Sequence, residues 1–289
     1  MDALPPYSLA VDGGGTQCRI ALCSSDDPLI VRAGSVNVST DFDGAVAEIS
    51  RGLEVLSGQS GVSLDALHDC PAYLGLAGVT GAGLVDRLVS ALPFRNVRIE
   101  DDRPAALRGA LGGRDGVVAH CGTGSFLAAQ IDGQTRFAGG WGSVLGDEAS
   151  AQWVGRRALS CALDSVDGFV ERSALTAAML ERFTDAAGIV RFAGSAEPAE
   201  MGALARDVTA SAAEGDRVAR QILQEGADYI ARRCDAMGWS AGLGLCLTGG
   251  IGPHYEDYFP AAMRADLVSP EGDPLAGAIA LAEAFRRSL

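Results

Sequence analysis

One arrangement occurs twice in this chain of 289 residues: a strand-like run, a glycine-rich turn and a second strand-like run. The first copy, LAVDGGGTQCRIAL, spans Leu9 to Leu22, and the second, VVAHCGTGSFLAAQI, spans Val117 to Ile131. Apolar residues alternate on both sides of each turn, as they do in β-hairpins with one buried face. Glycine lets a backbone approach an anion closely, and successive N–H groups in such a turn form an anion site. The repeat therefore predicts a duplicated fold in which each half supplies one phosphate-binding turn.

Helix-like and strand-like segments alternate along the rest of the chain, which predicts the α/β class. Asp41 is expected to cap an amphipathic helix, and a longer helix is expected from about Asp216 to Met237. Asp132-Gly133 indicates a hairpin turn, and Leu267-Val268 is expected to form a short strand. The repeated hairpins predict two domains, 1–115 and 116–273. The final helix, 274–289, is expected to return to the first domain.

Composition excludes several classes of function. All 23 basic residues are arginine, so a Walker-type phosphate lysine and a Schiff-base mechanism are excluded. The net charge of −14 argues against nucleic acid or an anionic membrane as a partner. The seven cysteines form no CxxC pair, and the N-terminus carries no signal-peptide pattern. A cytoplasmic enzyme that acts on small molecules is the expectation.

Further candidate residues follow the strands. Asp12, directly before the first turn, is placed to hold a hydrated divalent cation. Val97 to Ile99 reads as a strand that delivers Glu100, Asp101 and Asp102 at its C-terminal end. The segment GGWGSVLGDEASAQW shows no regular period until Asp147, which is expected at or near the N-terminus of the next helix.

Together these motifs resemble the actin-like ATPase superfamily of sugar kinases, Hsp70 chaperones and actin. DGGGTQCRIAL matches the first phosphate motif, HCGTGSF the second, and LTGGIG the adenosine motif. The segment GGWGSVLGDEASAQWVGR is similar to the signature of the N-acetylglucosamine kinase and glucosamine kinase branch. That branch shares the BadF/BadG/BcrA/BcrD-type family with the activating ATPases of benzoyl-CoA reductase. The implied fold is two ribonuclease H-like domains with an interdomain cleft.

The resemblance also implies roles for residues that match the family's motifs. The implied reaction is phosphorylation of an amino sugar, N-acetylglucosamine or glucosamine, at its 6-hydroxyl by ATP with Mg²⁺. Asp12 would organise the metal through water, and Asp102 would be the catalytic base. The nucleotide would be held by residues of three turns: Asp12, Gly13, Gly14, Gly15, Thr16 and Gln17; Gly122, Thr123 and Gly124; Gly249 and Gly250. The sugar would be contacted by Asn37, Asp102, Thr123, Gly140, Asp147 and Ala151.

Two positions depart from the family's pattern. The family usually has asparagine before the catalytic aspartate, whereas here the string is Asp101-Asp102-Arg103-Pro104. Counting back from Ala106-Leu107 selects Asp102, and Asp147 is the next candidate if the acidic pair is only a solvated turn. Ala149 replaces the usual glycine.

Two other functions stay open. The first is an ATPase that drives a partner enzyme, as the reductase activators do, although the paired-cysteine context of those proteins is absent here. The second is a regulator of the repressor-kinase type, which would need a DNA-binding segment before Leu9. The sequence does not decide which amino sugar is the acceptor. The oligomeric state also stays open, although dimers are usual in the resembling families. Among the histidines, His120 is expected only to support the second phosphate turn.

Overall fold

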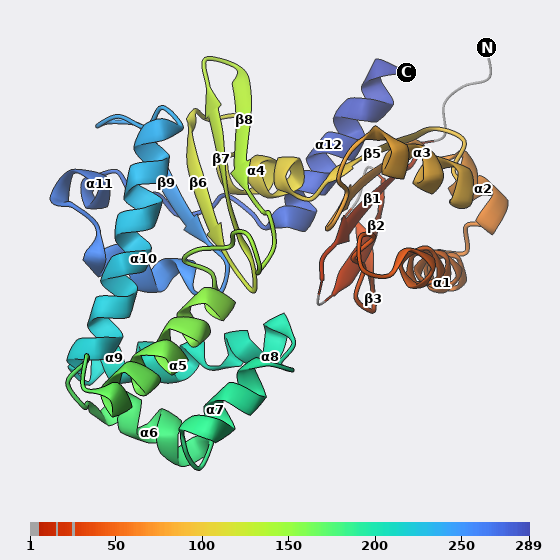
Figure 1. Cartoon of the computed structure of the whole chain (residues 1–289). Coiled ribbons are helices and arrows are strands. Elements are labelled where there is room, and N and C mark those ends of the chain that lie inside the picture. The colour runs from red at the N-terminus through yellow and green to blue at the C-terminus, as the bar shows by residue number, and fades with distance from the viewer. Residues whose placement is uncertain (1–5, 16, 25–26) are drawn as a thin grey trace. The chain divides into compact units, whose positions relative to one another are not determined.

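The computed structural model describes residues 6–15, 17–24 and 27–289. The chain divides into two compact units. Unit 1 consists of Met1–Gly113 and Pro270–Leu289, and unit 2 consists of Arg114–Ser269. Figure 1 shows that each unit is built on its own β-sheet.

The sheet of unit 1 has the strand order β3-β2-β1-β4-β5. Strand β1 pairs antiparallel with β2 and parallel with β4, and β4 pairs parallel with β5. The carboxyl ends of β1, β4 and β5 therefore lie at one edge of the sheet, which places the residues that follow them close together. The strands are β1 Ser8–Gly13, β2 Cys18–Cys23, β3 Leu29–Ala33, β4 Ala72–Leu76 and β5 Val97–Asp101.

Helices cover both faces of this sheet. On one face, α1 and α3 pack with the larger apolar side chains of the strands, among them Leu9, Val11 and Leu74. On the other face, α12 packs beside α4 over small residues such as Ala10 and Ala21. The helices are α1 Phe42–Ser60, α2 Leu64–Asp69, α3 Ala82–Ala91, α4 Arg103–Leu111 and α12 Pro274–Ser288.

The sheet of unit 2 repeats this plan with the strand order β8-β7-β6-β9. Strand β6 pairs antiparallel with β7 and parallel with β9, as β1 does with β2 and β4. Asp132 and Gly133 have φ values of 51° and 73°, so they form the two-residue turn between β7 and β8 that the sequence predicts. The strands are β6 Gly116–Cys121, β7 Ser125–Ile131, β8 Gln134–Gly139 and β9 Gly244–Thr248.

The apolar core of unit 2 lies between one face of this sheet and a set of helices that includes α5 and α10. Asp216 caps α10 by accepting the N–H of Ala219 at 3.0 Å, so the helix begins where the sequence predicts it. The helices are α5 Ala151–Asp167, α6 Ala174–Arg182, α7 Ala186–Ala193, α8 Pro198–Ala203, α9 Ala205–Ala213, α10 Arg217–Ala236, the 3₁₀ helix η1 Gly252–Tyr258 and α11 Ala261–Ala265.

The two matching sheets confirm the predicted α/β class and the duplicated hairpin. The predicted strand at Leu267-Val268 is reduced to one parallel bridge between Leu267 and Leu245. Strand β3 has no counterpart in the sequence prediction, and β8 is indicated there only by the hairpin turn that precedes it. In β8, the residues Gln134 to Arg136 are exposed, so the strand lacks the apolar alternation that would have identified it.

Candidate functional site

The first predicted phosphate turn joins β1 to β2 in unit 1. The N–H of Gly14 donates to the carbonyl of Gln17 at 3.0 Å, and the hydroxyl of Ser35 donates to the carbonyl of Gly15 at 2.7 Å. Gly13 is needed for packing, because a Cβ there would lie 2.6 Å from the Leu76 side chain. A Cβ on Gly15 would meet nothing within 4 Å. Thr16 lies outside the described residues, so its predicted role stays a prediction.

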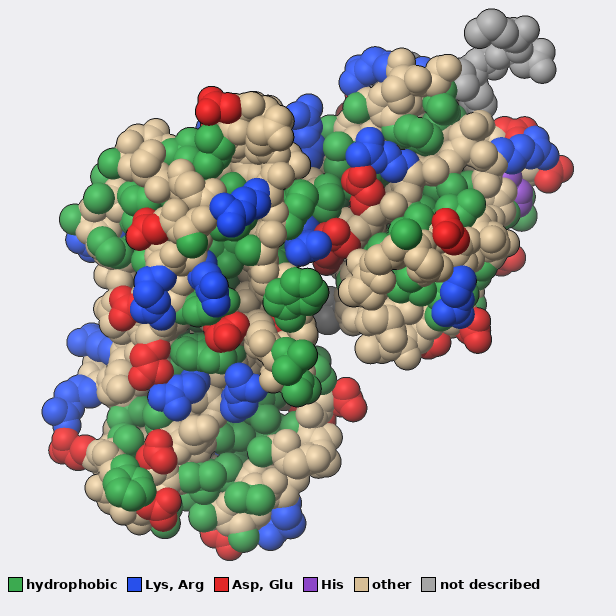
Figure 2. Space-filling model, turned by 45° about the horizontal axis from the view of Figure 1, so that its top comes forward, with side chains coloured by type: hydrophobic (Ala, Val, Ile, Leu, Met, Phe, Trp, Pro, Cys, Tyr) green, Lys and Arg blue, Asp and Glu red, His purple; other side chains and the backbone are tan. Residues whose placement is uncertain are grey.

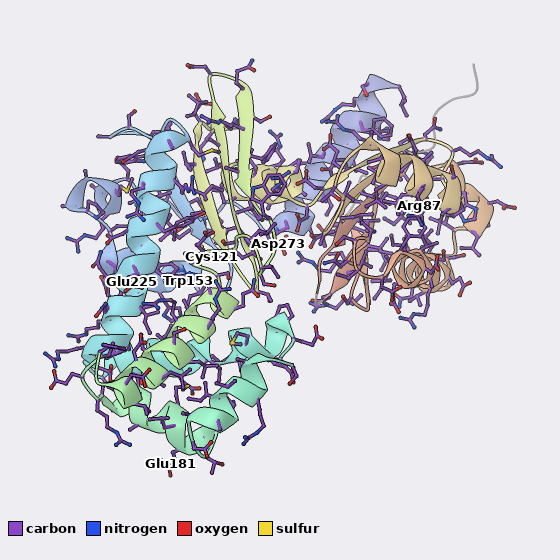
Figure 3. All side chains as sticks on the ribbon, viewed as in Figure 1. Arg87, Cys121, Trp153, Glu181, Glu225 and Asp273 are labelled. Carbon is purple, nitrogen blue, oxygen red and sulfur yellow. The ribbon has the colours of Figure 1, made fainter. Side chains whose placement is uncertain are left out.

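Asp12 stands beside this turn, near the end of β1. Arg19 of β2 donates to the Asp12 carboxylate through Nε at 3.0 Å and Nη2 at 2.5 Å, and its Nη1 forms an ion pair with Asp273. Asp273 is the N-cap of α12 and is labelled in Figure 3. Burial raises the pKa of Asp12, although the hydrogen bonds from Arg19 act in the opposite direction. Both bonds from Arg19 go to Oδ2, and no hydrogen bond to Oδ1 is found among the described residues.

The two adjacent carboxylates after β5 differ in their partners. Arg103 donates its backbone N–H at 3.0 Å and its Nε at 2.6 Å to Oδ1 of Asp101, and its Nη2 at 3.1 Å to Oδ2. Asp102 is the N-cap of α4 but makes no capping hydrogen bond with its side chain. Burial, followed by the negative charges of Asp101 and Asp12, raises the pKa of Asp102 to about 6. A partly buried carboxylate with this pKa is suited to accept a proton near neutral pH.

Asn37 lies at the same edge of the sheet of unit 1. It forms a parallel bridge with Ala77, the residue after β4. Its Oδ1 accepts the N–H of Ser39 at 3.1 Å and the hydroxyl of Ser39 at 2.8 Å. Because Oδ1 is held in this way, the Asn37 amide nitrogen is left to donate to a ligand. Unit 1 thus brings Asp12, Asn37 and Asp102 to the carboxyl ends of neighbouring strands.

The second predicted phosphate turn, Gly122 to Gly124, joins β6 to β7 in unit 2. The N–H of Gly122 donates to the carbonyl of Gly124 at 2.9 Å, and the carbonyl of Gly122 accepts the N–H of Ala151 at 2.8 Å. The turn is therefore fixed to the first residue of α5. The Thr123 side chain is exposed. Cys121, which is labelled in Figure 3, is the last residue of β6 and is buried.

The predicted adenosine segment directly follows β9 and packs against this second turn. Gly249 has φ +79°, and a Cβ on it would lie 2.3 Å from the carbonyl oxygen of Cys121. The N–H of Ile251 donates to the same carbonyl at 3.0 Å. A Cβ on Gly250 would meet nothing within 4 Å. Gly249 therefore allows the two loops to touch, whereas Gly250 leaves an open backbone surface.

The structure corrects the expected position of Asp147. It lies four residues before α5, whose N-cap is Ser150, and has a φ of 60°. Its buried carboxylate accepts the side-chain amide of Gln152 at 2.9 Å, and hydrogen bonds from the N–H groups of Ser125 and Gly142 oppose the rise in its pKa caused by burial. A Cβ on Gly124 would lie 2.8 Å from this carboxylate. Asp147 thus packs against the second phosphate turn and accepts the N–H of Ser125, the residue that follows this turn.

The residues around Asp147 also take left-handed conformations. Gly140 has φ +76° and donates its N–H to the carbonyl of Ser125 at 2.9 Å. Ala149, where the resembling family has glycine, is buried with φ +63°. This conformation explains the glycine of the family, because a Cβ is disfavoured there. Unit 2 brings together Gly140, Asp147, Ala151 and the turns at 122–124 and 249–250.

Sequence reasoning missed the contributions of Arg19 and Arg103. The positions of both were visible, since Arg19 follows the first turn and Arg103 follows the acidic pair. Their partners were not visible, because Asp273 is distant from Arg19 in the chain and a choice between Asp101 and Asp102 requires side-chain geometry.

A comparison with protein-family models matches residues 9–273 to the BadF/BadG/BcrA/BcrD ATPase family. The chain belongs to this family. The match covers both units, and it confirms the resemblance drawn from the motifs. It also supports ATP as the nucleotide of this BadF-family protein.

Individual relatives agree with this assignment. The chain is 25% identical over 280 residues to the glucosamine kinase GspK of Vibrio cholerae, covering 96% of this chain and 95% of that protein. It is 25% identical over 234 residues to an N-acetylmuramic acid/N-acetylglucosamine kinase of Clostridium acetobutylicum, covering 76% of each. A solved structure of a proposed N-acetylglucosamine kinase from Chromobacterium violaceum is 33% identical, with a TM-score of 0.84, and covers 96% of this chain and 99% of that one. These relatives confirm the expected enzyme class of this BadF-family chain, a carbohydrate kinase.

Two further observations concern partners. None of the helices in the described part of the chain has the length and apolar character needed to cross a bilayer. On the face drawn in Figure 2, arginine and acidic side chains are interspersed, and no broad basic area covers unit 2.

Proposed function

We propose that this BadF-family protein phosphorylates the 6-hydroxyl of an amino sugar, N-acetylglucosamine or glucosamine, with ATP and Mg²⁺ as cosubstrates. The observation that carries this proposal is the Asp102 carboxylate. It is partly buried, makes no capping hydrogen bond, and lies at the same sheet edge as Asp12. The relatives that act on amino sugars supply the substrate class.

In the proposed reaction, Asp102 accepts the proton of the sugar hydroxyl. The hydroxyl oxygen forms a bond to the γ-phosphorus while the bond between that phosphorus and the β,γ-bridging oxygen breaks, and ADP leaves. Phosphoryl transfer depends mostly on positioning and on neutralising charge, so one base and two phosphate turns are a sufficient set. The backbone N–H groups of the turns at 13–15 and 122–124 would bind phosphate oxygens.

The residues near Asp12 fit a hydrated Mg²⁺. No hydrogen bond to Oδ1 of Asp12 is found among the described residues, and the negative charge of Asp12 raises the pKa of Asp102, as expected for carboxylates that face a cation-binding region. Bound Mg²⁺ would neutralise part of the charge on the phosphates. Arg19 would keep Asp12 in place by its two hydrogen bonds. The sugar would be contacted by Asn37, Asp102, Thr123, Gly140, Asp147 and Ala151.

The alternative, an ATPase that activates a reductase, requires cysteines that can hold an iron–sulfur cluster. All seven cysteines are buried. Burial raises the pKa of the Cys18 thiol to about 12 and that of the Cys246 thiol to about 11, which disfavours the thiolate that binds metal. These facts favour the kinase.

The test is a coupled ADP-release assay with Mg²⁺ and a panel of sugars that includes both amino sugars, glucose and N-acetylmuramic acid. ADP release should depend on an amino sugar and produce its 6-phosphate, identified by NMR. If ADP release were the same without sugar and with each sugar of the panel, the kinase proposal would be rejected in favour of the ATPase alternative.

A further inference from the structure

His120 and Thr248 occupy matching positions before the two nucleotide loops of unit 2. They are paired in the register of the parallel strands β6 and β9. His120 is the penultimate residue of β6 and precedes the turn at 122–124, and Thr248 ends β9 directly before Gly249. Nδ1 of His120 lies 3.0 Å from the Thr248 hydroxyl. One side-chain pair therefore connects the strand ends from which both loops begin.

The duplicated hairpin makes His120 the counterpart of Asp12. Both are the fifth residue of a six-residue strand, and both are followed by a tight turn and an antiparallel partner strand. The preceding residues, Val11 and Ala119, each belong to the apolar core of their own unit. Because side chains alternate along a strand, Asp12 and His120 both lie on the opposite face of their sheets. In unit 1 this position carries the carboxylate at the first phosphate turn. In unit 2 it carries an imidazole.

The His120 ring is held in a defined orientation. It stacks on Phe126 of β7 with a centroid separation of 4.9 Å and an interplanar angle of 18°. Its Nε2 reaches the phosphate turn, because a Cβ on Gly122 would lie 3.1 Å from this atom. No hydrogen-bond partner for Nε2 is found in the described part of the chain. Burial lowers the pKa of His120 to about 4, so the ring is neutral at pH 7.

We propose that His120 is a nucleotide-binding residue whose Nε2–H donates to a phosphate oxygen held by the turn at 122–124. In this proposal the Thr248 hydroxyl acts as the donor to Nδ1, so the ring hydrogen is carried by Nε2. This ring supplies a neutral side-chain donor directly beside the second turn. The proposal rests on the proposed function, which assigns phosphate binding to that turn.

Two substitutions separate the two ring nitrogens. His120→Asn places an amide where Nδ1 lies, so it keeps the bond to Thr248 and removes the donor at Nε2. His120→Gln places its amide nearer to Nε2. A purely structural histidine, which acts only through Thr248, should therefore be replaced better by asparagine, whereas a phosphate donor should be replaced better by glutamine.

The experiment measures binding of ATP and of adenosine to each full-length variant by calorimetry. His120→Asn should weaken ATP binding by about 10- to 100-fold, the range for a hydrogen bond to a charged group, while His120→Gln stays within about threefold of wild type. Adenosine affinity should be the same in all three proteins. Equal ATP affinity in His120→Asn and wild type, or an equal loss for adenosine, would overturn the proposal. Failure of wild type to bind ATP would instead refute the proposed function.

A second measurement needs no variant at position 120. The chain has three histidines, so nitrogen-15 NMR of the labelled protein can resolve each ring. The His120 ring should show the Nε2–H tautomer at pH 7, and its Nε2 signal should shift when ADP binds. Thr248→Val should remove this preference and Thr248→Ser should restore it. An Nδ1–H tautomer, or an Nε2 signal that ADP leaves unchanged, would overturn the proposal.

Discussion

Arg103 donates three hydrogen bonds to the carboxylate of Asp101, whereas the carboxylate of Asp102, which lies between them in the chain, makes no capping hydrogen bond. Two adjacent and chemically identical side chains are thereby given different properties. Asp101 is fixed in place as part of an ion pair. Burial and the negative charges of Asp101 and Asp12 raise the pKa of Asp102.

The rate of phosphoryl transfer should fall at low pH. If Asp102 is the base, only its ionised form supports turnover, and its pKa is about 6. kcat/KM should therefore lose about tenfold per pH unit below about 6. The measurement is a pH–rate profile with the protein shown to be folded at each pH. A rate that stays constant from pH 7 to pH 4.5 would contradict the assignment.

Asp102→Asn should stabilise the fold at pH 8. The folded-state pKa of about 6 exceeds the ordinary value of 3.8, so the ionised carboxylate opposes folding above pH 6, and this cost disappears as the pH falls towards 3.8. The free energy of unfolding should rise by about 1–3 kcal/mol at pH 8, and the gain should shrink at pH 5. Asp101→Asn is the matched control and should lower stability by up to about 1 kcal/mol, because it weakens the pair with Arg103. Urea unfolding at the two pH values measures both effects.

Asp12→Asn should raise the Mg²⁺ concentration needed for half-maximal rate. Asparagine keeps the shape of the side chain but attracts a hydrated cation less strongly, and a shift of about tenfold or more is expected. Asp273→Asn is the control, because Asp273 is the other charged partner of Arg19 but caps α12 and does not belong to β1. The control should leave the Mg²⁺ dependence within about twofold of wild type. If both variants raised the required Mg²⁺ concentration equally, the cause would be the loss of a charged partner of Arg19, and the proposed metal contact of Asp12 would be contradicted.

Gly250→Ala should fold normally and bind ATP poorly. A Cβ there meets no protein atom within 4 Å, so only a ligand packed on this surface would be displaced. Gly249→Ala is the contrasting variant, because its Cβ would lie 2.3 Å from a backbone oxygen and its φ is +79°. It should lower the melting temperature, whereas Gly250→Ala should not. ATP affinity at the wild-type level in Gly250→Ala would remove the predicted adenosine contact.

The elements that the sequence predicts well are those with a strong local signal. The repeated hairpin, the cap at Asp41 and the turn at Asp132-Gly133 each depend on residues close together in the chain. Asp147 was harder to place, because its position depends on a left-handed backbone and on N–H groups from Ser125 and Gly142. The interactions of Arg19 could not be predicted from nearby residues either. Arg19 pairs with Asp12 and also with Asp273, which caps the last helix.

The most direct test of the account compares kcat for Asp101→Asn and Asp102→Asn with an amino sugar and Mg-ATP. Removal of a general base typically lowers the rate by about 10²–10⁴, so Asp102→Asn should lose that much of kcat while the affinity for the sugar changes less. Asp101→Asn should keep most of kcat, because the amide can still accept from Arg103. Loss of turnover in Asp101→Asn with near wild-type kcat in Asp102→Asn would contradict the account.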